Sequence, residues 1–198
     1  MFGTSLKQKD LFANETPIAT KNANAIIMLT DYGKDKVNGK VDAAKIIGFH
    51  RSEAIGGQLH LTNYRLIFKS HWINRLRGKF SIFLNTIQDV RDASQMLAKK
   101  IQVSALSQSY EFVIWGIPQF LQTLDDARKN MSTEQMLALK PEIESNIEKV
   151  GTGLDYSKGV DLALRGVLNI ENIALNPLSL SSYIDIAEIF GDVSKKEK

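Results

Sequence analysis

Apolar and polar residues alternate in a series of short segments between positions 40 and 115 of this 198-residue chain. Alternation with a period of two, in segments rich in Ile, Phe, Tyr and Thr, is typical of half-buried strands. The sequence therefore predicts strands within 41–51, 57–70, 79–84, 86–90, 100–106 and 110–115, with a turn at Gly56-Gly57. Short strands this closely spaced favour a sandwich or barrel.

The alternation gives way to helical spacing after residue 116. Pro118 suits the first turn of a helix, where its missing N–H is not needed, and Phe120, Leu121 and Leu124 then recur on one face. The sequence thus predicts a helix that follows the strands and ends near Met131.

The last third of the chain is predicted to be helical throughout. Ser132 to Gln135 has the spacing of a capping box, which marks a helix start. Pro141 predicts that this helix is interrupted and restarts, and Gly151 predicts the next helix end. Two more helical segments are expected within 159–169 and 183–190.

The first 39 residues are less regular. The segment from Lys21 to Val37 fits a short helix, and a strand through residues 26–29 is the alternative. The charged run at 34–36, directly after Gly33, is unlike a strand, so the helix is preferred.

One string carries a family resemblance. Residues 57–70 read GQLHLTNYRLIFKS, which resembles the corresponding segment of GRAM domains, members of the pleckstrin-homology-like superfold, and is most similar to the myotubularin-type version. The resemblance implies an α+β fold: a PH-like β-sandwich or barrel at 40–131, capped by a C-terminal helix. An N-terminal extension at 1–39 and a helical extension at 132–198 would flank it.

Within this string, the resemblance implies structural roles for Asn63 as a turn former and for Tyr64 as a packed aromatic residue. Strict alternation would place Leu66 on the same face as Tyr64. A bulge or bend near Thr62-Asn63 would reset the phase of the strand.

Charge is distributed unevenly around the string. The net charge of +3 is too small to predict bulk nucleic-acid binding. The window 54–88, however, contains no Asp or Glu, and it holds Arg65, Lys69, Arg75, Arg77 and Lys79 with two histidines. An anionic partner, such as a lipid headgroup, a phosphate or an acidic peptide, is one interpretation, and a solvated basic face is the other.

The connection between two predicted strands combines these cations with apolar residues. Trp72, Ile73 and Leu76 alternate with arginines there, a composition suited to an anionic membrane surface. The alternative is that Trp72 and Leu76 fold back onto the core. The candidate anion- or membrane-binding residues are Lys69, His71, Trp72, Arg75, Arg77 and Lys79.

Catalytic chemistry has little support in the sequence. The chain has no cysteine, no nucleophile elbow and no phosphate loop, so it is not expected to be an enzyme. The phosphatase activity of myotubularins belongs to a separate domain that uses a cysteine. His50, His60 and His71 lack ligand spacing, so neither a metal nor a cofactor is predicted.

The expected function is that of a non-catalytic binding module, contacting anionic phospholipid through the basic loop. The alternative is a protein-interaction module that uses the C-terminal helices as a docking or oligomer surface. No apolar run approaches the roughly 20 residues that span a bilayer. A cytoplasmic protein is therefore expected, with any membrane contact being peripheral.

Overall fold

The computed structural model describes residues 3–28, 52–74, 76–95, 98–105, 108–151 and 153–156. Eight strands form one sheet: β1 (Pro17–Met28), β2 (Ser52–Thr62), β3 (Arg65–Ser70), β4 (Leu76–Phe83), β5 (Ile87–Asp92), β6 (Lys100–Ala105), β7 (Gln108–Ile114) and β8 (Gly153–Tyr156). The helices are η1 (Gln8–Asp10), η4 (Leu84–Thr86), α2 (Ile117–Asn130), α3 (Thr133–Ser145) and α4 (Ile147–Val150).

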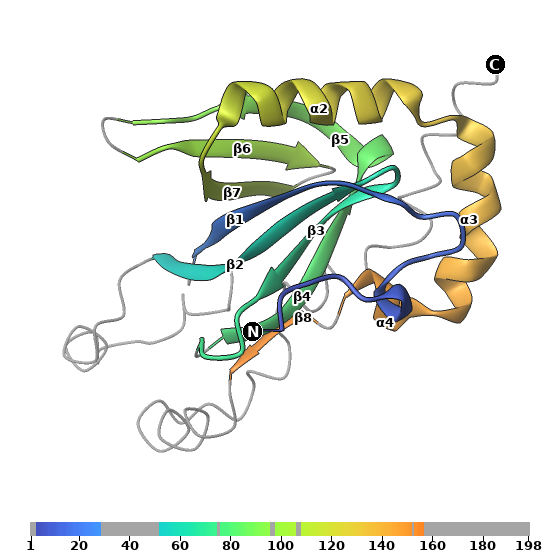
Figure 1. Ribbon diagram of the computed structural model, residues 1–198, viewed down its shortest axis with the longest axis horizontal. Coiled ribbons are helices and arrows are strands. Elements are labelled where there is room, and N and C mark those ends of the chain that lie inside the picture. The colour runs from blue at the N-terminus through green and yellow to red at the C-terminus, as the bar shows by residue number, and fades with distance from the viewer. Residues whose placement is uncertain are drawn as a thin grey trace, which may run out of the picture.

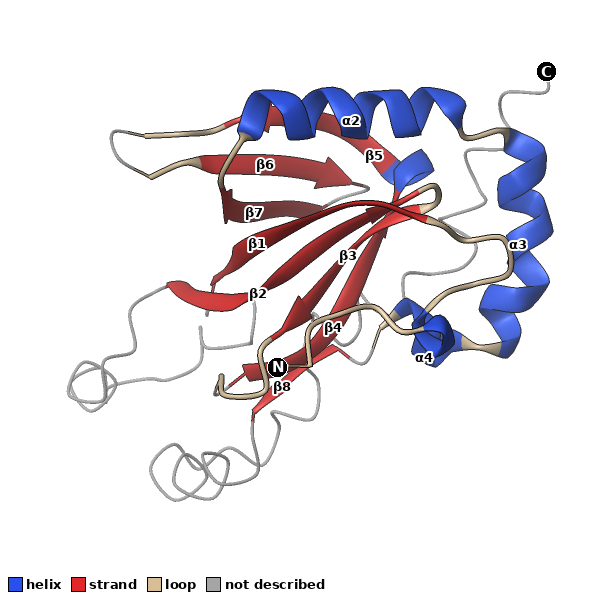
Figure 2. Cartoon of the chain, viewed as in Figure 1, coloured by secondary structure: helices blue, strands red, loops and turns tan. Residues whose placement is uncertain are grey.

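The strands follow the order β5-β6-β7-β1-β2-β3-β4-β8, and every neighbouring pair is antiparallel. Figures 1 and 2 show α2 along the β5 side of the sheet, and α3 turning away from it toward the β3–β4 side. The prediction of an α+β fold is therefore confirmed.

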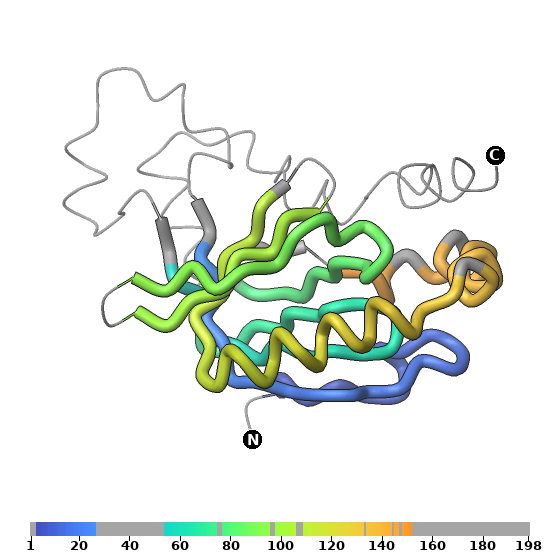
Figure 3. The backbone as a smooth tube through the Cα atoms, turned by 90° about the horizontal axis from the view of Figure 1, so that it is seen from above, coloured from blue at the N-terminus to red at the C-terminus, as the bar shows by residue number. Residues whose placement is uncertain are grey.

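The sheet bends around one main core, which α2 covers (Figure 3). Phe68 of β3, Phe80 of β4 and Phe112 of β7 contact one another there, with ring centroids 5.4 to 6.1 Å apart. The helix contributes Phe120 and Leu124 from its buried face. Burial of these apolar surfaces is the main term that stabilises such a fold.

A second buried cluster lies on the other side of β3 and β4, which we call the outer face. Here α3 contributes Met136, Leu139 and Ile143, and the N-terminal segment (residues 3–16) contributes Phe12. The outer face itself consists of three cross-strand pairs, Arg65 with Phe83, Ile67 with Ser81, and Lys69 with Lys79.

The helix predicted from Lys21 onward is wrong as far as Met28, because this segment belongs to β1. Ala23 and Ala25 are buried whereas Asn22 and Asn24 are exposed, a strand pattern that weakly apolar alanines hide in the sequence. Pairing with β2 on one side and β7 on the other overrides the local preference. The sheet therefore includes residues before the predicted boundary at 40.

The predicted turn at Gly56-Gly57 is also wrong, since both glycines lie inside β2. A Cβ atom on Gly57 would clash with the backbone carbonyl oxygen of Lys69 and come within 2.7 Å of Cζ of Phe68, far inside van der Waals contact. Glycine is needed here for close packing against β3. In a sequence, a glycine that allows close packing cannot be told from a glycine that forms a turn.

Several other expectations are confirmed. The strands predicted at 79–84 and 86–90 correspond to β4 and β5, and the hairpin at 100–115 corresponds to β6 and β7. Pro118 lies in the first turn of α2, and Ser132 and Gln135 form the capping box of α3.

Two expectations for the C-terminal part are wrong. Pro141 lies inside α3 without interrupting it, because buried residues on both sides of the proline hold the helix against the outer face. Gly153–Tyr156 forms β8 instead of a helix and pairs with β4. The strand predicted at 41–51 and the helices predicted at 159–169 and 183–190 lie outside the described residues.

Replacing Gly57 by alanine should destabilise the fold by about 1–3 kcal/mol, because the new methyl group would clash with the backbone carbonyl of Lys69 and with the ring of Phe68. Gly56→Ala is the matched control, since its Cβ would meet neighbouring side chains no closer than 3.4 Å. Urea denaturation of both variants measures the difference. Equal stability of the two variants would contradict the packing requirement at Gly57.

Candidate functional site

The Thr62-Asn63-Tyr64-Arg65 string forms the turn between β2 and β3 and fixes the N-terminal segment to it. The side chain of Asn63 accepts a hydrogen bond from the Thr16 amide and donates one to the Asn14 carbonyl. Oγ1 of Thr62 accepts from the amides of Tyr64 and Arg65. The predicted bend near Thr62-Asn63 is thus confirmed, and buried Tyr64 has the packing role expected of it.

Arg65 is completely buried, and all five of its N–H donors are used. Nε and one terminal nitrogen bind the two carboxylate oxygens of Glu15, at 2.8 and 2.9 Å. The remaining donors reach Oγ of Ser81 and the backbone carbonyls of Lys149 and Asp10. The guanidinium carbon also lies 4.3 Å from the ring centroid of Phe12.

Arg65 is therefore unavailable to an external anion, although the sequence analysis counted it in the basic window. Its contacts join the N-terminal segment, β4 and α4 into one body. Thr62, Asn63 and Arg65 thus hold the turn and the N-terminal segment together.

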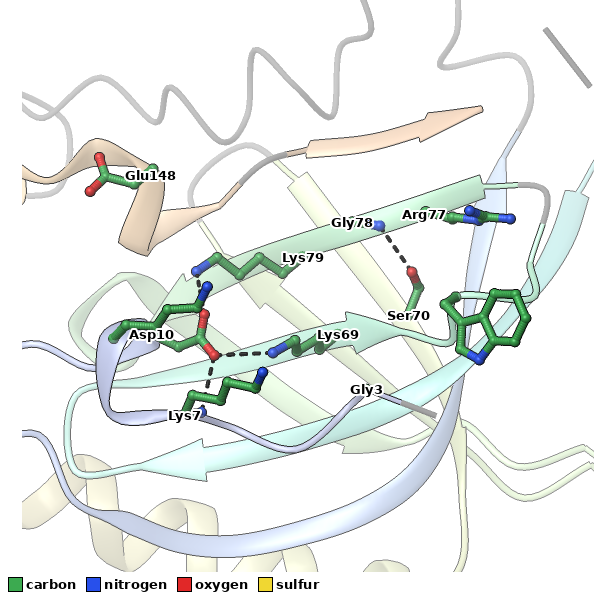
Figure 4. Close-up of a pocket in the computed structure, with 11 residues that line it drawn as sticks. Gly3, Lys7, Asp10, Lys69, Ser70, Arg77, Gly78, Lys79 and Glu148 are labelled. Atoms are coloured by element: carbon green, nitrogen blue, oxygen red, sulfur yellow. Dashed lines mark hydrogen bonds and ion pairs between the residues drawn. The ribbon is translucent and has the colours of Figure 1, made fainter. Parts of the chain in front are cut away.

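Beside this network lies a cavity of about 570 Å³, here called the basic pocket. The N-terminal segment, β3, the described part of the β3–β4 loop (residues 71–74), β4 and α4 surround it (Figure 4). Five of its lining residues are cationic and two are acidic. The lining consists of Gly3, Lys7, Lys9, Asp10, Lys69, Ser70, Trp72, Arg77, Gly78, Lys79 and Glu148.

Asp10 lies between two lysines at one end of the basic pocket. Its Oδ2 accepts from Nζ of Lys69 at 3.0 Å, and its Oδ1 accepts from Nζ of Lys79 at 3.1 Å. Burial alone would raise the pKa of Asp10. The Lys7 amide and the two ammonium groups outweigh burial and hold the pKa well below its usual value. Asp10 is therefore an ionised carboxylate across the whole physiological pH range.

The two lysines differ in their surroundings. Lys79 is more deeply buried than Lys69, and this burial lowers its pKa, an effect that Asp10 offsets only in part. Lys69 also donates to the carbonyl of Ser5 at 3.0 Å. The N-terminal segment thus holds both ammonium groups at fixed positions.

The β3–β4 loop forms the other end of the basic pocket. Trp72 and Ile73 are 58% and 59% exposed, so the alternative that Trp72 folds back onto the core is not what the structure shows. The guanidinium of Arg77 lies 6.0 Å from the Trp72 ring centroid, and its Nε donates to the carbonyl of Asn74.

The structure brings four of the six predicted site residues together, since Lys69, Trp72, Arg77 and Lys79 all line the basic pocket. His71 is half-buried and lies against Gly56 instead. Arg75 lies outside the described residues.

Sequence reasoning missed the N-terminal contribution to the pocket, namely Lys7, Lys9 and Asp10. These residues lie about 60 positions before the strands that they approach. No local pattern in the sequence signals that pairing, because the link runs through the buried contact between Glu15 and Arg65.

The described residues contain no group of three or more His, Asp or Glu side chains that could hold a metal ion. Among the described helices, none is long and apolar enough to cross a membrane.

His60 links the N-terminal segment to β2 from a buried position. Its Nε2–H donates to the carbonyl of Thr4 at 2.8 Å, and Nδ1 accepts from the Thr20 hydroxyl at 2.9 Å. Burial lowers the pKa of His60 below its usual 6.5; the Thr4 carbonyl and Asp10 oppose this effect, and Lys69 adds to it. The folded protein therefore keeps this imidazole neutral to lower pH than the unfolded chain does.

Breaking the Arg65–Glu15 pair from either side should cost about 3–5 kcal/mol of unfolding free energy, because each single change leaves a buried charge without its partner. Arg65→Met and Glu15→Leu test the two sides by chemical denaturation. The double variant should lose much less than the sum of the two. Additive losses would mean that the pair is not coupled.

Lys129→Ala is the control for this cycle. Lys129 pairs with Asp125 on the exposed surface of α2, where both side chains are at least half exposed. Its removal should leave the denaturation midpoint nearly unchanged.

The unfolding free energy should fall as the pH drops below about 6.5, because the unfolded chain then binds a proton at His60 that the folded chain resists. Denaturation midpoints measured between pH 7.5 and 5 should show a shallower decline in His60→Gln than in the parent protein. Identical slopes would contradict a lowered pKa.

No protein-family model matches the chain, and no curated protein matches it. Among solved structures, the chain is similar to the C-terminal domain of an unknown protein from Leishmania infantum. The sequence identity is 18% and the TM-score is 0.41, and the match covers 60% of this chain and 88% of that one.

Proposed function

We propose that this chain is a non-catalytic binding module of the GRAM type, within the pleckstrin-homology-like superfold, and that it associates with anionic membrane surfaces through the β3–β4 loop. Two features support the assignment to this superfold. One is the string at 57–70, and the other is the succession of seven antiparallel strands followed by α2, which covers the main core.

The observation that carries the membrane proposal is the exposure of Trp72 and Ile73 in one loop beside the basic pocket. A tryptophan ring settles at headgroup depth, where apolar and polar surroundings meet. Nearby basic residues each contribute about 1 kcal/mol at an anionic surface. The loop supplies the inserted apolar side chains, and the adjacent pocket supplies the basic residues. Either contribution alone gives only weak membrane binding.

The alternative, a protein-interaction module, receives less support from the described part of the C-terminal region. Met136, Leu139 and Ile143 form the apolar face of α3, and they are buried against the outer face of the sheet. That face of the helix is thus already used within the chain.

The test is co-sedimentation with vesicles of phosphatidylcholine alone or with about a third phosphatidylserine, at roughly 50 and 500 mM salt. We expect binding to the anionic vesicles that weakens at high salt and is lost in Trp72→Ala/Ile73→Ala. The matched control is Trp115→Ala/Ile18→Ala, which removes the same residue types from exposed positions elsewhere, 74% and 46% exposed.

Fluorescence gives a second readout. In a Trp115→Phe background, the emission comes from Trp72 alone, because the chain has two tryptophans. Insertion at headgroup depth should shift this emission to shorter wavelength on anionic vesicles. Binding that is equal for both double variants, without a shift, would refute a contact through the loop.

A further inference from the structure

We infer that the basic pocket is a binding site for a phosphomonoester, a terminal phosphate group that carries close to two negative charges. This inference deepens the proposed function, because it names the chemical group recognised next to the loop. It rests on the geometry of the pocket, however, and it is tested in solution without a membrane.

The first argument is that part of the site is already assembled. Asp10 holds the ammonium groups of Lys69 and Lys79 within 3.1 Å of its carboxylate, and its own position is fixed by the Lys7 amide at 3.0 Å. Lysine side chains normally lose considerable rotamer freedom when they bind a ligand. Here that cost is already met in the folded protein, so a bound anion gains more from each contact.

The second argument is the charge that Asp10 leaves uncompensated. Lys7, Lys9 and Arg77 reach the same cavity, and no described carboxylate pairs with any of them. Lys7 and Lys9 are exposed on the N-terminal segment. In Figure 4, Lys7, Lys69 and Lys79 converge on the Asp10 end of the pocket, and Glu148 lies apart on α4. The lining of the pocket therefore carries an excess of positive charge, most of it at the Asp10 end.

The third argument is a neutral donor within the pocket. Ser70 is 8% exposed, and its Oγ accepts a hydrogen bond from the Gly78 amide at 2.9 Å. A hydroxyl that accepts one hydrogen bond can also donate one. An anion in the cavity can accept it, and hydrogen bonds to charged acceptors are stronger than those to neutral ones.

These features favour a phosphomonoester over other anions. Ammonium groups act as point charges without a preferred plane, which suits a tetrahedral oxyanion better than a flat carboxylate. A doubly charged group is attracted strongly enough to overcome repulsion from Asp10, whereas a phosphodiester carries a single charge. The volume of about 570 Å³ lies in the range of small-molecule sites, so it can take a phosphate together with its alcohol.

The experiment is a titration of the full-length, isotope-labelled protein by NMR, with glycerol 3-phosphate as the monoester and glycerophosphoglycerol as the diester. The amides of Lys7, Ser70 and Gly78 should shift in a saturable manner with the monoester, and about tenfold more weakly with the diester. Lys7→Ala/Lys9→Ala should weaken monoester binding by roughly tenfold or more.

The matched control is Lys99→Ala/Lys129→Ala, which removes the same charge from exposed positions that do not line the pocket. It should leave the affinity unchanged. If the monoester and diester bind equally, or if both double variants weaken binding alike, the site is only a diffuse basic surface and the inference is overturned.

Vesicles then identify the source of the phosphate. Phosphatidic acid presents a monoester and phosphatidylserine a diester, and the vesicles are matched for surface charge. A preference for phosphatidic acid that requires Lys7 and Lys9 assigns the site to a lipid headgroup. Binding of glycerol 3-phosphate without that preference assigns it to a free phosphorylated molecule, and both outcomes support the pocket.

The two proposals can also fail separately. Monoester binding in solution without any vesicle binding would refute the membrane function and leave the pocket standing. Salt-sensitive vesicle binding through Trp72 and Ile73, without saturable monoester binding, would do the reverse.

Discussion

The buried pair of Arg65 and Glu15 is the interaction on which the rest of the described structure depends. Both side chains are fully buried, and 50 residues of sequence separate them. An arginine in such a position is stable only when every donor is satisfied and the opposite charge is held close. The N-terminal segment supplies Glu15 and the Asp10 carbonyl, so it must pack against the sheet for the sheet itself to be stable.

The same constraint builds the candidate site. Arg65 binds the backbone carbonyl of Asp10, and the side chain of that residue then reaches Lys69 and Lys79, which lie farther along the outer face. A structural motif therefore determines where the basic pocket forms. A change at Arg65 would disturb the basic pocket through Asp10, although Arg65 does not line it. A loss of the proposed anion binding in an Arg65 variant would therefore not identify Arg65 as a binding residue.

The elements that could be predicted are those whose own sequence shows a regular pattern of apolar and polar residues. Alternation predicted β4, β6 and β7, and helical spacing predicted α2, because each buries a chemically distinct face against the core. Strand β1 was predicted only at its end, where a strand through 26–29 was the alternative to a helix. The rest was missed because its buried residues there are alanines set between asparagines, and its stability comes from two neighbouring strands. Gly57 was misread because close packing and a turn both require glycine.

The same distinction between local and long-range signals applies to the residues of the candidate site. Lys69, Trp72, Arg77 and Lys79 could be predicted, since they lie in or beside one loop and the sequence shows their charges together. Lys7, Lys9 and Asp10 could not, because a contact between segments about 60 residues apart leaves no periodic trace. The basic window alone indicated a diffuse cationic surface. Adding the N-terminal segment turns that surface into a partly open cavity with a fixed carboxylate. A shaped site of this kind is what the proposed discrimination between anions requires.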